Sequence, residues 1–135
     1  MVQTYTNDRM PGGLKGALVV VWFQAVVNVV FAMNLFHEHR TDLDNGRTDD
    51  SGFLLTSAWG TLGIAALLAA GALGTAARHN WARRTVITLE ALNILGGVVV
   101  VLLGGVVPGL LAMVVSATVI GGFGSTRAVA WIWGR

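Results

Sequence analysis

A carboxylic acid lies within an otherwise apolar segment of this 135-residue chain. Glu90 is the one acidic residue between Thr85 and Gly104, and Asn93 follows it by about one helical turn. A carboxyl group inside a membrane segment is costly to bury, faces the interior of a helical bundle, and is a candidate functional group. Glu90 could exchange a proton or hold a polar or cationic ligand.

Two amides on an earlier apolar segment could complete a site around Glu90. Gln24 and Asn28 are one turn apart and share a helix face. Counted from Lys15 and Arg84, Gln24 and Glu90 would both lie about 9–14 Å into the inner half of a bilayer. We therefore predict one buried polar cluster, formed by Gln24, Asn28, Glu90 and Asn93. Its alternative role is to hold the helices together, with a neutral Glu90 donating a hydrogen bond to Gln24.

Residue types that bind metals follow the first apolar run. His37 and His39 form a His-x-His pair in an acidic segment, residues 37–52. Such a set could bind a divalent cation loosely, although a run of charges is also typical of a solvated loop. We expect a solvated loop, with no metal site and no cofactor.

The composition excludes several classes of protein. Hydrophobic residues make up 54% of the chain and charged residues only 12%, against about 25% charged in an average soluble domain. The chain contains no cysteine, which excludes disulfides, cysteine-ligated metals and thiol chemistry. No Ser-His-Asp or HExxH pattern is present. We therefore expect an integral membrane protein that is not an enzyme and does not bind nucleic acid.

Four apolar runs are each long enough to cross a bilayer core of about 30 Å as a helix of about 20 residues. They cover residues 14–36, 53–77, 85–104 and 108–126. Glycines before Pro108 separate the last two, because glycine ends helices and proline fits a first turn. We predict an all-α integral membrane four-helix bundle. The single transmembrane domain, 1–135, has an acidic outer loop 37–52, a basic inner loop 78–84 and a short Arg/Trp tail 127–135.

The basic residues predict an orientation. On one side of the four spans lie Arg9, Lys15, Arg78, Arg83, Arg84, Arg127 and Arg135, and on the other lie only Arg40 and Arg47. Cytoplasmic segments carry the excess of Lys and Arg, so both termini should be cytoplasmic. We expect the inner arginines to contact anionic lipids.

Small residues and tryptophans predict how the spans pack. Close helix contacts in membranes use small residues four positions apart. Such stripes are Ala66, Ala70 and Gly74 in the second span, and Ala117, Gly121 and Ser125 in the fourth. Interface anchors at the membrane boundaries are predicted at Trp59, Trp81, Trp131 and Trp133. The small faces favour a homo-oligomer or a complex with another membrane protein.

Several short sequence stretches are similar to those of one group of membrane proteins. They are Trp22-Phe23-Gln24-Ala25, Arg83-Arg84, Leu89-Glu90-Ala91-Leu92 and the Arg/Trp tail. In these features the chain resembles small four-span membrane proteins of actinobacteria. The resemblance implies a bacterial cytoplasmic membrane, but no known activity. We expect a small non-enzymatic membrane protein acting through helix–helix contacts, as an accessory subunit, modulator or immunity-type protein. The alternative is an oligomeric ion- or proton-coupled transporter or channel centred on Glu90.

Overall fold

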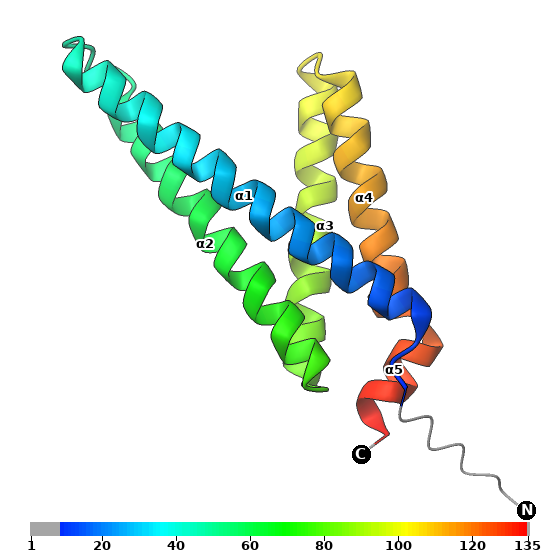
Figure 1. Cartoon of the computed structure of the whole chain (residues 1–135). Helices are drawn as coiled ribbons and strands as arrows, with labels where there is room; N and C mark the ends of the chain where they lie inside the picture. Colours follow the sequence, from blue (N-terminus) through cyan, green and yellow to red (C-terminus); the bar gives the residue numbers. More distant parts are fainter. Residues whose placement is uncertain (1–8, 135) are drawn as a thin grey trace, which may run out of the picture.

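The computed structural model describes residues 9–134, which form five helices joined by short turns (Figure 1). In chain order these are α1 (Gly12–Asp44), α2 (Ser51–Ala76), α3 (Asn80–Leu102), α4 (Val106–Gly124) and α5 (Thr126–Trp133). The first four are long and apolar enough to cross a membrane, which confirms the predicted number of candidate spans. Arg135, used above to predict the orientation, lies outside the described residues.

The turn between α3 and α4 forms where the glycines and proline predict it. Gly104 adopts φ +95°, a conformation that glycine reaches without a steric penalty. The N–H of Gly105 donates to the carbonyl of Val100 at 2.9 Å, which closes the end of α3. Pro108 lies in the first turn of α4, where its missing N–H breaks no helical hydrogen bond.

Three boundaries differ from the sequence expectation. The inner loop, predicted at 78–84, is shorter, because α3 already begins at Asn80 and includes the basic residues Arg83 and Arg84. The first helix continues through the polar residues after Phe36 to Asp44, so the outer loop is confined to residues 45–50. Hydropathy detects where apolar residues end, but the backbone stays helical to Asp44 and turns only at Asn45 and Gly46, where Gly46 has φ +72°. The tail 127–135 also contains a helix, α5, whose N-cap Ser125 accepts a hydrogen bond from the N–H of Ala128 at 3.2 Å.

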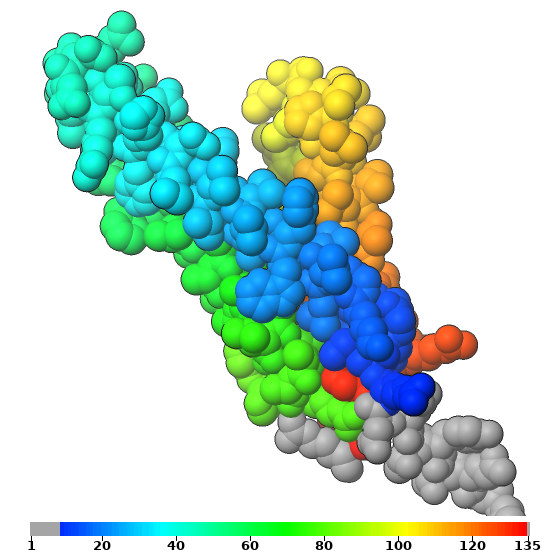
Figure 2. Space-filling view, in the orientation of Figure 1, coloured from blue at the N-terminus to red at the C-terminus, as the bar shows by residue number. Residues whose placement is uncertain are grey.

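The helices pair as two antiparallel hairpins, α1 with α2 and α3 with α4. The hairpins meet at the end where α1 begins and α5 ends, and they diverge toward the other end (Figure 1). Figure 2 shows the same opening between the two outer arms as a deep notch in the surface. We call the joined end the inner end and the separated halves the outer arms. Between the hairpins, α2 packs on α3 and α1 packs on α4.

Glycines bring the hairpins into close contact at the inner end. A Cβ atom on Gly122 of α4 would lie 2.5 Å from the Cβ of Ala17 on α1. On α2, a Cβ on Gly71 would lie 2.5 Å from Cγ2 of Val86, and one on Gly74 would lie 2.6 Å from the Cβ of Ala82. Since these distances are below van der Waals contact, only glycine permits this spacing. Large side chains, among them Leu14, Leu68 and Phe123, fill the core beside these contacts.

Candidate functional site

The buried carboxyl of Glu90 lies where α1 crosses α3. Its side chain has 0% of its surface exposed, which is rare for a glutamate. Nε2 of Gln24, on α1, donates a hydrogen bond to Oε2 of Glu90 at 3.3 Å. This bond joins the two hairpins, because Gln24 belongs to the first hairpin and Glu90 to the second. The structure therefore brings together the two residues at the centre of the predicted polar cluster.

Two oxygen atoms of this pair lack hydrogen-bond partners. Oε1 of Glu90 and Oε1 of Gln24 are both buried, and neither accepts a hydrogen bond. Burying a polar atom without a partner costs free energy, of the order of 1–3 kcal/mol in proteins. The Gln24–Glu90 pair thus has unused acceptor capacity inside the molecule.

No basic side chain forms an ion pair with Glu90 in the part of the chain that the structure describes. Helices α2 and α4 carry no ionisable side chain along their whole lengths. The basic residues nearest in sequence on the other two helices are Lys15 and Arg84, about 9–14 Å along the helix axes from the pair. Among the described residues Glu90 forms no ion pair, and Gln24 is its one polar partner. An ionised Glu90 would therefore be an uncompensated buried charge.

The other two predicted members of the cluster lie elsewhere. Asn28 donates from Nδ2 to the backbone carbonyl of Gln24 at 2.8 Å, so it bonds within its own helix. Asn93 is exposed. The predicted four-residue cluster is therefore limited to a pair, because Asn28 bonds within α1 and Asn93 lies on an exposed side of α3.

Two buried hydroxyls were not predicted from the sequence. Ser116 on α4 and Thr75 on α2 are both fully buried, and neither hydroxyl has a hydrogen-bond partner. Ser116 interrupts an apolar stretch of α4, which is a detectable signal. The small-residue spacing instead predicted packing roles for Ala117 and Gly121, which lie on the same helix.

The predicted packing stripes largely face outward. Ala66, Ala70, Ala117 and Gly121 are all exposed in this single chain. Gly74 is buried against α3, and Ser125 donates to the carbonyl of Gly122 at 3.1 Å while capping α5. The faces that meet within the chain are instead those of Gly71 and Gly122, adjacent to the predicted stripes. Small residues lie on several sides of both helices, so their spacing alone did not select the buried side.

The tryptophans occupy both ends of the molecule. Trp59 meets the ring of Phe36 edge-on in the outer arm, at 5.3 Å between centroids. At the inner end Trp81 and Trp133 are exposed, and the ring of Trp131 lies 4.3 Å below the guanidinium carbon of Arg78. These positions suit the interfacial role predicted for them.

The histidine pair does not converge on one point. His37 and His39 are two residues apart on α1, and successive helical residues are turned by about 100°, which points the two rings in nearly opposite directions. Among residues 9–134, no group of three or more His, Cys, Asp or Glu side chains could hold a metal ion.

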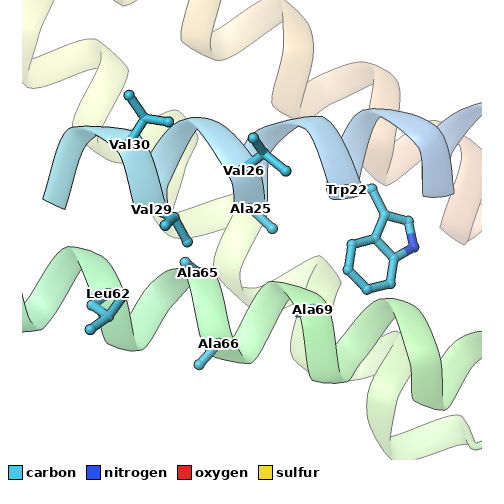
Figure 3. Close-up of a pocket in the computed structure, with 9 residues that line it drawn as sticks. All are labelled: Trp22, Ala25, Val26, Val29, Val30, Leu62, Ala65, Ala66 and Ala69. Atoms are coloured by element: carbon cyan, nitrogen blue, oxygen red, sulfur yellow. The ribbon is translucent and has the colours of Figure 1, made fainter. Parts of the chain in front are cut away.

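An apolar groove of about 370 Å³ follows the α1–α2 hairpin near the pair. In Figure 3, Ala65 of α2 points toward Val29 of α1, and the ring of Trp22 extends from α1 toward α2. Its lining is Trp22, Ala25, Val26, Val29, Val30, Leu62, Ala65, Ala66 and Ala69. The chain matches no protein-family model, no curated protein and no solved structure.

Proposed function

We propose that this chain is a small non-enzymatic protein of a bacterial cytoplasmic membrane that acts through helix–helix contacts. It would serve as an accessory subunit, a modulator or an immunity-type protein, with both termini in the cytoplasm. The observation that carries the proposal is the exposure of the small-residue faces of α2 and α4. Close approach of membrane helices depends on such faces, and here they remain uncovered.

The outer arms support the same proposal. Large apolar side chains of α1, α3 and α4 are exposed there, including Phe31, Leu95 and Leu111. Single exposed apolar residues need no explanation in a lipid environment. Helices α2 and α4 also expose Ala66 and Ala117 near their midpoints, and these small residues allow a neighbouring helix to approach closely.

Disulfide cross-linking in native membrane vesicles tests this function, because the chain has no cysteine of its own. We expect Ala117→Cys, on the exposed stripe, to cross-link to a second copy or to another membrane protein. Ser116→Cys is the matched control, because position 116 is fully buried. Monomer alone from Ala117→Cys, Gly121→Cys and Ala66→Cys would contradict the proposal.

A second function, ion- or proton-coupled transport in an oligomer, is favoured by Glu90 alone. A buried carboxyl with an unpartnered oxygen in a membrane span is a plausible place for a transported ion or proton to bind. Four short spans rarely enclose a path by themselves, so transport would need at least a dimer. We expect Glu90→Gln to abolish a pH-dependent flux in proteoliposomes, with Asn93→Gln as the control. Absence of flux in the parent protein would reject this function.

The cytoplasmic location of both termini is proposed from the charges. Lys15, Arg84 and Arg127 are exposed at the inner end, and Asp42, Asp44 and Asp49 lie near the outer loop. A membrane-impermeant thiol reagent applied to intact cells should label Asn45→Cys and spare Arg127→Cys. The reverse pattern would place the termini outside.

A further inference from the structure

A single proton could satisfy both oxygens of the Gln24–Glu90 pair that lack hydrogen-bond partners. An ionised carboxylate and an amide oxygen are both acceptors only, so neither can satisfy the other. A carboxylic acid has one O–H donor in addition to its acceptor oxygen. A proton bound to Oε1 of Glu90 would therefore turn this atom into a donor. The new O–H could then donate a hydrogen bond to Oε1 of Gln24.

We propose that Glu90 binds a proton on Oε1 and pairs with Gln24 as a carboxylic acid with a primary amide. In this pair the amide Nε2 donates to Oε2, as observed at 3.3 Å, and the acid O–H donates to the amide oxygen. This second bond requires the two Oε1 atoms, which are both buried and without partners, to face each other across the pair. It would satisfy both oxygens at once.

The surroundings of the pair favour a proton over other cations. Gln24 faces Glu90 from α1 and is uncharged, while α2 and α4 contribute no titratable or charged group anywhere along their lengths. On α3 itself the charged residue on the same face is Arg83, about two turns toward the inner end, where its Nε donates to the carbonyl of Phe123 at 2.8 Å. Arg84 is exposed. A metal ion such as Ca²⁺ or Mg²⁺ needs about six oxygen ligands. Only two unpartnered oxygens belong to this pair.

A proton on Glu90 would be the ligand of the residue that the proposed transport function uses, so the inference rests on that second function. The two can fail separately. A protonated Glu90 without any flux would leave a neutral joint between the hairpins and reject transport. An ionised Glu90 would reject the proposal whatever the flux.

Side-chain carboxyl labelling of glutamate with ¹³C tests the proposal on the unmodified chain. The sequence has only two glutamates, Glu38 and Glu90, and Glu38 is exposed near the outer end of α1. Magnetic-resonance spectra of the full chain in phospholipid bilayers at neutral pH should then show two carbon signals. We expect one in the carboxylate range from Glu38 and one in the carboxylic-acid range from Glu90. Glu38→Gln, a change on the surface, should remove the first and keep the second.

The geometry of the pair is tested by its partner residue. Gln24→Leu should shift the acid signal, because the hydrogen bonds from and to the amide are lost. Asn28→Leu is the matched control and should leave the signal in place, since Asn28 bonds to backbone. The exchanged variant, Gln24→Glu with Glu90→Gln, should show an acid signal from position 24. Two carboxylate signals in the parent protein, or an acid signal unmoved by Gln24→Leu, would overturn the proposal.

Discussion

The inner end and the outer arms use similar residues but pack them differently. At the inner end, Gly71, Gly74 and Gly122 bring helices of different hairpins close together. In the arms each hairpin contacts only itself, and the packed helices α1 and α2 line an apolar groove of about 370 Å³. A membrane helix has no hydrophobic incentive to leave lipid, so packing detail decides which faces meet. The comparison indicates that the inner end is the part of the molecule that holds its shape alone.

Polar contacts follow the same division. Nε of Arg83 on α3 donates to the carbonyl of Phe123 at 2.8 Å, near the end of α4. Arg78 lies over Trp131 of α5, and the Gln24–Glu90 bond marks the outer limit of the joined region. Beyond Glu90, no side-chain hydrogen bond between the two hairpins occurs among the described residues. We therefore expect the arms to depend on lipid or on a neighbouring protein for support.

The largest expected effect comes from filling a close contact at the inner end. Gly122→Ala would force its Cβ to 2.5 Å from that of Ala17, so we expect a loss of about 1–3 kcal/mol in unfolding free energy. Gly121→Ala is the matched control, because no atom lies within 4 Å of its Cβ. Reversible unfolding in mixed detergent measures both. Equal losses of unfolding free energy for the two variants would mean that the Gly122 side of α4 is packed no more closely than the Gly121 side.

Removing the partner of Glu90 should have a smaller effect. Gln24→Leu leaves a buried carboxyl without its hydrogen bond, and we expect a loss of about 1–2 kcal/mol. Asn93→Leu, on the exposed side of α3, should change stability by less than about 0.5 kcal/mol. The same unfolding measurement compares them. A harmless Gln24→Leu would mean that the pair does not join the hairpins.

The smallest effect is expected at the turn between α2 and α3. Arg78 adopts φ 61°, a left-handed conformation that costs residues other than glycine about 1–2 kcal/mol. Arg78→Ala and Arg78→Gly both remove the contact with Trp131, but only glycine relieves the backbone. We expect Arg78→Gly to be the more stable of the two by about 1 kcal/mol. A less stable glycine variant would contradict this reading of the turn.

Local features of the chain were predictable from the sequence. The four long apolar helices follow from hydropathy, and the break before Pro108 follows from its glycines. Gln24 and Glu90 were paired through their similar depth on two helices that run the same way. Each of these inferences needs only the position of a residue along its own helix.

Features that depend on how helices cross were not predictable. Asn93 shares a face with Glu90, but the divergence of the hairpins leaves it exposed. Ala66 and Ala117 have the right spacing for packing, yet adjacent faces of the same helices were the ones used. The continuation of α1 to Asp44 depends on backbone structure in a polar segment, which hydropathy does not report.

The central claim is that the hairpins join at the inner end and separate outward. Spin labels on pairs of introduced cysteines test it in bilayers, with one pair across the outer ends, Asn45→Cys with Leu103→Cys, and one across the inner end, His79→Cys with Gly124→Cys. The account predicts a long distance across the outer ends and a short, narrowly distributed distance across the inner end. Similar short distances for both pairs would mean that the hairpins stay in contact along their whole length, and would contradict the claim.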